Sequence, residues 1–375
     1  MKILFVSAIL PYPLHSGGQV RIYNLLKRLS QKHDITLYAF IRDEKENECI
    51  RELSFCKKVV TVLRGRAWQV RYIFQSLFTS FPFLYATYNN RQMKTVLDQE
   101  LENTYDLIHL EPGYVWLSLP ETKLPVVVSE HNIEHEVYKK YAHHGNFLLR
   151  PFMNWDVAKM DRWEKYIWAK ADRIVTVSQS DRAIIGQSNA SVVPNGVDIK
   201  EFAFRPKKSV SKNLTFLYVG NFRWMENRDT AQHLIQDIWP AVKEKYPKAT
   251  LRIVGKNTPS STYFVGSVEN IQDELYAADI MLAPIRVGGG TKYKILESMA
   301  TGLPVVTTPL GAQGMNIHDR KEVWIGRTSA EILLAIHDII GGTQRKKVLE
   351  KARKLVEDHY SWDHIAQALD SVWKK

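Results

Sequence analysis

Short apolar runs alternate with helical patterns along most of this 375-residue chain, and this alternation constrains the fold more than any other feature. The first run, at residues 2–8, is followed by an apolar pattern of helical spacing at residues 19–31 and by a second run at residues 34–40. Such a βαβ beginning predicts a parallel sheet with right-handed crossovers. Further predicted strands of this half are residues 58–63, 107–110, 126–129, 173–177 and 191–193. We therefore predict an open α/β domain.

The same pattern starts again after a polar, basic stretch at residues 204–212. A predicted strand at residues 214–219 leads through a helix at residues 228–246 to another strand at residues 250–254. The chain length also favours two domains. The predicted parts are a first domain at residues 1–200, a second domain at residues 201–356 and a closing helix at residues 357–375. Ligands of open α/β sheets bind outside the carboxyl ends of the strands, so we expect the site in a cleft between the two domains.

The net charge of +11 is distributed unevenly. Residues 53–97 contain seven Lys and Arg side chains and no Asp or Glu, and aromatic side chains lie between the basic ones. A cationic segment with aromatic residues suits an anionic membrane surface, and we favour this partner. The alternative is a solvated basic helix above core aromatics. Nucleic acid is disfavoured because no binding motif accompanies the charge.

The cysteines and the N-terminal segment bear on the compartment. Cys49 and Cys56 are the two cysteines, and they form neither a disulfide framework nor a metal-binding pattern. The first apolar run is short and leads at once into a loop with proline and glycine, unlike a signal peptide. No run approaches the roughly 18 apolar residues of a membrane-spanning helix. We therefore expect a cytoplasmic protein that binds peripherally to the inner face of the membrane.

The segment at residues 284–300 carries the most specific chemical pattern. Its three consecutive glycines allow backbone amides to approach a ligand closely. The helix that follows, which Thr291 can cap, offers N–H groups and positive potential to a phosphate. Lys292 and Lys294 add charge, and the Glu297 carboxylate can accept hydrogen bonds from both hydroxyls of a ribose. The alternative is a glycine-rich turn before an ordinary helix. The candidate binding residues in this segment are Gly289, Gly290, Thr291, Lys292, Lys294 and Glu297.

One run of residues and four shorter segments occur in an order that resembles family 4 of the retaining glycosyltransferases, which have the GT-B fold. The run, at residues 294–306, is Lys-Ile-Leu-Glu-Ser-Met-Ala-Thr-Gly-Leu-Pro-Val-Val. The shorter segments are residues 171–178, 193–198, 216–220 and 360–362. The resemblance implies two Rossmann-like domains facing a cleft, with the final helix crossing back to the first domain. It implies that the second domain binds a UDP- or GDP-sugar and the first a glycan or lipid-linked acceptor. It also implies hexose transfer with retention of configuration, in polysaccharide biosynthesis, without a cofactor or divalent metal.

Two positions depart from the pattern of that family. The family has a Glu-x7-Glu motif, but Gly289 stands at the first position and only Glu297 is present. Arg223 fits a phosphate-binding arginine of the family, with a surface charge as the alternative. Asn227 stands where a lysine is expected, and we expect a lysine of the glycine-rich segment to replace that charge. The identity of the sugar is therefore left open.

Candidates in the first domain follow predicted strands. Gly17 and Gly18 come after the first strand and open a helix, which suits an anion; the resemblance implies contact with the donor phosphate or the acceptor, and a tight packing turn is the alternative. The resemblance also implies that His131 positions or stabilises the reacting sugar, with capping or packing as the alternative. His109 and Glu111 are second-rank candidates for the cleft.

Other classes of site and function are weaker. His131 and His135 have the i, i+4 spacing of half a zinc motif, but Glu134 stands one place late for His-Glu-x-x-His, so we expect no metal. A nucleotide-sugar epimerase would need acid and base carboxylates in the cleft. A nucleotide-sugar-binding protein without transferase activity would explain the missing first glutamate. A Rossmann dehydrogenase is disfavoured because no Gly-x-Gly-x-x-Gly follows the first strand.

Overall fold

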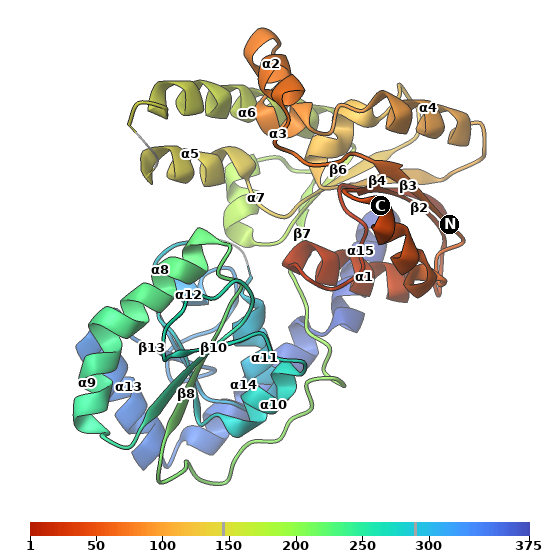
Figure 1. Cartoon of the computed structure of the whole chain (residues 1–375). Coiled ribbons are helices and arrows are strands. Elements are labelled where there is room, and N and C mark those ends of the chain that lie inside the picture. Colours follow the sequence, from red (N-terminus) through yellow and green to blue (C-terminus); the bar gives the residue numbers. More distant parts are fainter. Residues whose placement is uncertain (145–146, 289–290) are drawn as a thin grey trace. The chain divides into compact units, whose positions relative to one another are not determined.

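The computed structural model describes residues 1–144, 147–288 and 291–375, and Figure 1 shows its helices and strands. These residues form two compact units. The first unit contains Met1–Pro194 together with Ala366–Lys375, and the second contains Asn195–Ile365. Each unit is built on a parallel sheet of its own.

The first unit has a seven-stranded sheet in the order β3-β2-β1-β4-β5-β6-β7, with every pairing parallel. Its strands are β1 (Lys2–Ser7), β2 (Asp34–Ile41), β3 (Lys58–Leu63), β4 (Leu107–Glu111), β5 (Val126–Glu130), β6 (Arg173–Thr176) and β7 (Ala190–Val192). All the predicted strands of this half are present, with ends that differ by at most one residue. The strand order reverses between β1 and β4, so Glu111 at the end of β4 lies at the switch point where ligands of open sheets bind.

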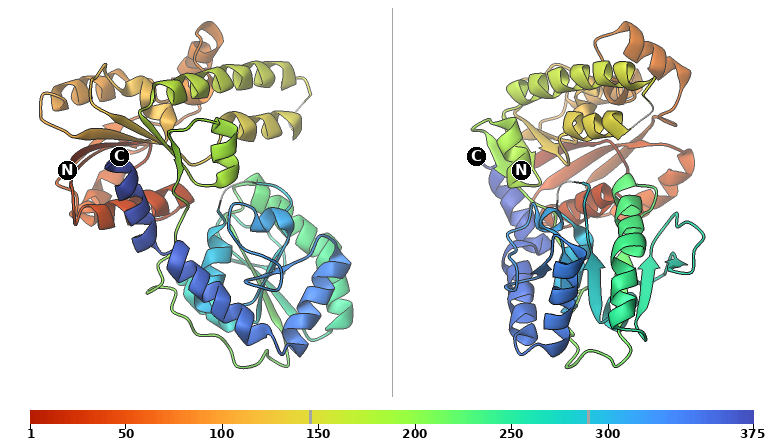
Figure 2. Two further views of the ribbon diagram at one scale, coloured as in Figure 1. Left: turned by 180° about the vertical axis from the view of Figure 1, so that it is seen from behind. Right: turned by 90° about the vertical axis from the view of Figure 1, so that its left-hand side faces the viewer.

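Helices cover both faces of this sheet (Figures 1 and 2). On one face lie α1 (Gly17–Leu29) and the end of α15 (Trp362–Trp373). On the other face lie α3 (Phe83–Ala86), α4 (Arg91–Glu100) and α6 (Arg150–Lys170). The remaining helical segments are η1 (Glu44–Leu53), α2 (Val70–Phe78), η2 (Gly113–Ser118), α5 (Glu134–His144) and α7 (Gln179–Ile185). Because Ser16 Oγ accepts a hydrogen bond from the Gln19 N–H at 3.3 Å, α1 begins two residues before its predicted start and includes Gly18 in its first turn.

The second unit has a six-stranded parallel sheet in the order β10-β9-β8-β11-β12-β13. Its strands are β8 (Thr215–Val219), β9 (Thr250–Val254), β10 (Phe264–Gly266), β11 (Ile280–Ala283), β12 (Val305–Thr307) and β13 (Trp324–Ile325). Its helices outside the predicted 228–246 segment are α10 (Ile271–Ala277), α11 (Tyr293–Thr301), α12 (Pro309–Ala312), α13 (Ser329–Gly341) and α14 (Arg345–His359). Two predicted elements of this unit need correction.

The helix predicted at residues 228–246 begins earlier and is interrupted. It consists of α8 (Met225–His233), a π-helical segment η3 (Leu234–Ile238) and α9 (Trp239–Lys245). Pro240 has no backbone N–H, so the regular helical ladder cannot continue through it, and the chain passes this point with a π-turn.

The closing segment is also not one helix, as predicted for residues 357–375, because α14 ends at His359 and α15 begins at Trp362. At the break, the Val197 N–H donates to the Tyr360 carbonyl at 2.7 Å. Gly196 lies against the Trp362 ring, which a Cβ at Gly196 would approach to 2.8 Å. The Tyr360 carbonyl, which would accept a helical hydrogen bond in a continuous helix, is therefore bonded to residue 197 instead.

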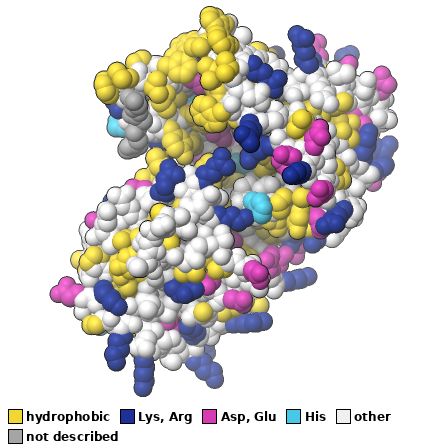
Figure 3. Space-filling model, in the orientation of Figure 1, with side chains coloured by type: hydrophobic (Ala, Val, Ile, Leu, Met, Phe, Trp, Pro, Cys, Tyr) yellow, Lys and Arg dark blue, Asp and Glu magenta, His cyan; other side chains and the backbone are white. Residues whose placement is uncertain are grey.

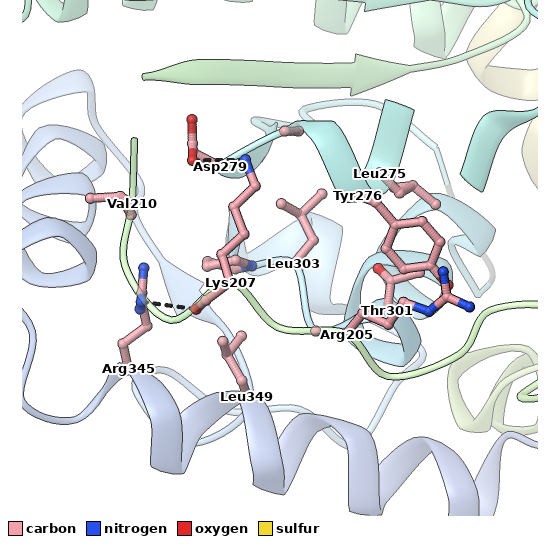
Figure 4. A pocket seen from close by; sticks show the side chains of 13 residues that line it. Arg205, Lys207, Val210, Leu275, Tyr276, Asp279, Thr301, Leu303, Arg345 and Leu349 are labelled. Carbon is pink, nitrogen blue, oxygen red and sulfur yellow. Dashed lines mark hydrogen bonds and ion pairs between the residues drawn. The ribbon is translucent and has the colours of Figure 1, made fainter. Parts of the chain in front are cut away.

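The basic stretch at residues 204–212 is anchored to the second unit. Figure 4 shows Lys207, whose Nζ donates to Asp279 Oδ1 at 3.0 Å, and Arg345, whose Nη2 donates to the Lys207 carbonyl at 3.1 Å. The other oxygen of Asp279 accepts the Thr215 N–H at 2.9 Å. These bonds hold the stretch at the amino ends of β8 and β11, which is the edge opposite the carboxyl ends of the strands.

Candidate functional site

In the second unit, two neighbouring strands each lead into a helix that begins at the carboxyl edge of the sheet. β8 leads to α8, whose N-cap is Trp224, and β11 leads to α11, whose N-cap is Lys292. Among the described residues, neither N-cap side chain accepts a capping hydrogen bond. The two helix N-termini therefore direct backbone N–H groups and positive potential to this edge, which is an arrangement that binds phosphate groups.

The Lys294 side chain links these two helices. It is half-buried, and its Nζ donates to Tyr218 Oη at 3.0 Å and to Asn227 Oδ1 at 2.7 Å. The Tyr218 hydroxyl donates to the same Asn227 oxygen at 3.1 Å. The ammonium of Lys294 thus lies beside the position where the resemblance calls for a lysine. Sequence reasoning missed Tyr218, because a tyrosine in a buried strand carries no chemical signal of its own.

Lys294 and Glu297 both titrate near neutral pH. Burial lowers the pKa of Lys294 from 10.5 to about 7, although the charges of Glu226 and Glu297 act in the opposite direction. Burial and the charge of Glu201 raise the pKa of Glu297 from 4.5 to about 7, while Lys294 lowers it. The two side chains are three residues apart on α11 and therefore share one helix face. In the part of the chain that the structure describes, the Glu297 carboxylate has no hydrogen-bond partner, so it can accept ligand hydroxyls.

The other predicted residues of this unit have different environments. Arg223 is exposed in the turn before α8, and its guanidinium forms no hydrogen bond or ion pair with any described residue. Thr291 is buried, but the N-cap of α11 is Lys292, so the prediction that Thr291 caps this helix is wrong. Gly289 and Gly290 lie outside the described residues.

A buried cluster centred on Glu111 occupies the carboxyl edge of the first unit. Glu111 Oε1 accepts from Arg21 Nε at 2.9 Å and from His131 Nε2 at 2.7 Å. Glu111 Oε2 pairs with His109 Nε2 at 3.0 Å. Burial alone would raise the pKa of Glu111, but the bonds from the two histidines and the charge of Arg21 hold it well below its usual 4.5. Sequence reasoning missed Arg21, which is buried within α1.

Hydrogen bonds fix the protonation pattern of this cluster. Trp373 Nε1 has only a proton to give and donates to His109 Nδ1 at 3.0 Å. His109 Nε2 must then carry the ring proton that it donates to Glu111, and burial lowers the pKa of His109, which favours this neutral form. His109 and Glu111 are fully buried, so they act on the site by holding His131, whose side chain is 19% exposed.

Gly18, in the first turn of α1, lies next to His131. A Cβ on Gly18 would stand 3.4 Å from both Cε1 and Nδ1 of the His131 ring. His131 Nε2 is hydrogen-bonded to Glu111 Oε1. Because an ionised carboxylate can only accept, His131 Nε2 carries the proton of this bond. The other ring nitrogen, Nδ1, faces Gly18 in the first turn of α1.

His135 belongs to a different environment from His131. Its Nδ1 pairs with Glu164 Oε2 at 2.5 Å, and Glu164 also accepts the backbone N–H of Glu134 at 2.7 Å. Glu164 therefore caps α5 and holds His135 for a structural reason. Within residues 1–144, 147–288 and 291–375, no group of three His, Cys, Asp or Glu side chains is arranged to hold a metal ion.

The basic segment at residues 53–97 does not form a single face. Lys57 and Lys58 lie at the amino end of β3 and pair with Asp34 and Glu100. The apolar part of the segment lies beyond the other end of that strand, in and around α2. No helix among the described residues combines the length and the apolar character needed to cross a membrane.

Two Rossmann-like units, each built on a parallel sheet of its own, are the architecture of the GT-B class of glycosyltransferase. A family described as Glycosyltransferase Family 4 matches residues 15–201, and one described as Glycosyl transferases group 1 matches residues 213–354. Because the two matches together take in most of the chain, this protein belongs to these glycosyltransferases.

Individual proteins agree with this assignment. The chain is 24% identical over 387 residues to an uncharacterized 44.6 kDa protein in the cps region of Klebsiella pneumoniae, covering 96% of both chains. It is 26% identical over 180 residues to the lipopolysaccharide core biosynthesis mannosyltransferase LpsB of Rhizobium meliloti, covering 40% of this chain and 49% of the relative. The crystal structure of HepE from Anabaena with UDP and glucose superposes with a TM-score of 0.65 at 15% identity, covering 100% of both chains. The predicted GT-B fold is confirmed.

Proposed function

We propose that this glycosyltransferase moves a hexose from a nucleotide-sugar donor to a glycan or lipid-linked acceptor, with retention of configuration, in polysaccharide biosynthesis. The observation that carries the donor assignment is the contact of Lys294 with Tyr218 and Asn227 beside the N-termini of α8 and α11. We place the reaction in the cytoplasm, at the inner face of the membrane.

The donor is held by groups of the second unit. Lys294 and the first-turn amides of the two helices bind the diphosphate, with Arg223 and Lys292 as further cations. Glu297 accepts hydrogen bonds from the ribose hydroxyls. The complex of HepE with UDP and glucose supports a UDP-sugar, and the mannosyltransferase LpsB supports a hexose. GDP is the alternative base.

The reaction needs position and charge more than a protein nucleophile. The bond from the anomeric carbon to the diphosphate breaks, the acceptor oxygen bonds to that carbon on the same face, and the acceptor proton passes to the leaving diphosphate. Lys294 and the helix amides stabilise the negative charge that develops there. His131, oriented through Glu111, positions or stabilises the reacting sugar. The chain supplies these positive groups itself, so we expect no divalent metal.

Membrane association completes the proposal, and it rests on α2. Val70, Phe74 and Phe78 of this helix are 67%, 54% and 79% exposed, and Arg71 beside them is exposed as well. Figure 3 shows apolar side chains gathered where α2 lies. An exposed apolar helix with basic neighbours suits the interface of an anionic bilayer.

The test is a panel of UDP- and GDP-sugars, with nucleotide release and binding both measured. We expect slow release from one donor, and weaker binding of that donor by Glu297→Gln above pH 7, where the wild-type carboxylate is ionised. Glu244→Gln, at an exposed position of α9, is the matched control. Tight binding without release indicates a binding protein, and conversion of the sugar without release indicates an epimerase. If no nucleotide-sugar binds, the donor site is wrong.

A further inference from the structure

Arg64 is a buried cation with unused hydrogen-bonding capacity. It directly follows β3, is 4% exposed and holds its guanidinium over the Tyr88 ring at 4.7 Å from the centroid. Nε and Nη1 are both buried, and neither has a hydrogen-bond partner among the described residues. No described carboxylate forms an ion pair with Arg64, and residues 53–97 contain no carboxylate at all.

This arrangement is costly unless an anion completes it. A buried charge without a partner destabilises the fold, and an arginine in such a place is normally paired with a carboxylate or a phosphate. The ring of Tyr88 compensates only in part, because a cation–π contact satisfies no N–H donor. The planar fork of the guanidinium matches the oxygens of a phosphate or carboxylate. An oxyanion is therefore the ligand that the site lacks.

The position of Arg64 assigns this anion to a substrate. The strands of this sheet are all parallel, so Arg64 after β3 and Glu111 at the end of β4 lie on the same carboxyl edge. The two strands are three spacings apart, which is about 14 Å. Tyr88, which stacks on Arg64, also contacts Tyr114 of η2, three residues after Glu111, with ring centroids 4.7 Å apart. Aromatic rings next to hydrogen-bonding groups are typical of the walls of a ligand site.

The neighbouring helix indicates what carries the anion. Tyr72 of α2 donates its hydroxyl to the Arg64 carbonyl at 3.4 Å and accepts from Arg71 Nη2 at 2.7 Å. Arg64 therefore lies at the base of α2, whose outer face exposes Phe74 and Phe78. A ligand with an anionic head and an apolar chain satisfies both features, whereas an acidic sugar satisfies only the first.

We propose that Arg64 binds the phosphate of a lipid-linked acceptor. This inference rests on the proposed transfer to such an acceptor and adds the group that recognises it. Arg64 donates from Nε and Nη1 to the phosphate oxygens, and the lipid chain leaves along the exposed face of α2.

The test compares farnesyl phosphate with farnesol by calorimetry, since the two probes share the apolar chain and differ in the phosphate. A saturating nucleoside diphosphate, UDP or GDP, keeps the phosphate from the donor site. The wild type should prefer farnesyl phosphate by at least about tenfold, as expected for charge-assisted hydrogen bonds. Arg64→Gln should abolish the preference and Arg64→Lys should keep part of it. Arg162→Gln, an exposed arginine of α6, should leave it unchanged.

Thermal melting without ligand separates recognition from a structural role. Arg64→Gln should melt at the same temperature as the wild type or higher, because it removes an unpaired buried charge. A clear fall in melting temperature, or an unchanged preference for farnesyl phosphate, overturns the proposal. So does binding of glucuronic acid through Arg64 without binding of farnesyl phosphate. Retained UDP or GDP binding by Arg64→Gln shows that the donor site is intact, so a failure here is distinct from a failure of the proposed donor site.

Discussion

Replacing Lys294 by methionine should stabilise the second unit while weakening donor binding. The lowered pKa, about 7 in place of 10.5, means that the fold disfavours the charged form of Lys294. Below pH 7 this cost is present in full and is about 4–5 kcal/mol, from about 1.4 kcal/mol per pKa unit. It declines as the pH rises, because the folded lysine is already neutral while the unfolded lysine stays charged up to pH 10.5. At pH 9 about 2 kcal/mol remains.

The substitution leaves its surroundings satisfied. Tyr218 still donates to Asn227 Oδ1 at 3.1 Å, so Lys294→Met orphans no buried acceptor. The melting temperature should therefore rise by about 8–20 °C at pH 7 and by about half as much at pH 9. Calorimetric melting at both pH values, with Lys248→Met at an exposed position as the control, measures this gain. Titration with UDP and GDP should show binding weaker by about tenfold or more at pH 7.

Two results would refute this reasoning about Lys294. The first is a loss of stability in Lys294→Met, which would make the ammonium a net stabilising group. The second is a stability gain that is the same at pH 7 and pH 9. Such a gain would come from the packing of methionine and not from the charge of Lys294, because only the charge makes the gain depend on pH.

Two further substitutions test the first unit. Glu111→Gln should cost about 3–5 kcal/mol of unfolding free energy at pH 7, because Arg21 loses its buried partner; urea unfolding measures this, and a cost no larger than that of the exposed Glu121→Gln would contradict it. The stabilising contribution of Glu111 is present in full above its usual pKa of 4.5 and is lost as the pH falls below that value, so the variant should approach the wild type only in strong acid. The double change Phe74→Ser and Phe78→Ser should reduce sedimentation with phosphatidylglycerol vesicles and leave nucleotide affinity unchanged, whereas the exposed Leu334→Ser in α13 should affect neither; unchanged sedimentation of the double variant would remove α2 from the membrane surface.

The sequence by itself determined the architecture. Periodicity is a local property, so the parallel strands of the first unit, the strands β8 and β9, and the helix α1 follow from the spacing of apolar residues alone. The glycines, lysines and carboxylate at fixed offsets near the start of α11 form a local pattern as well, and this pattern predicts a phosphate and ribose site. One exception is local, because Pro240 interrupts a predicted helix. The other is not, because the break at residues 360–361 depends on pairing with the distant residue 197.

Only the tertiary structure decided how the polar side chains are combined. Lys294 and Asn227 are 67 residues apart in sequence. No periodicity indicates that the ammonium of Lys294 donates a hydrogen bond to the side-chain amide of Asn227. Hydrogen bonds join residues across even longer separations in the first unit, namely Arg21 to Glu111 and Trp373 to His109. Such contacts are set by which strands are neighbours and by which side chains burial leaves without water, and both depend on the folded chain. The same is true of Arg64, which in the sequence is one of seven basic residues and in the fold is a buried guanidinium that has two nitrogens without partners among the described residues.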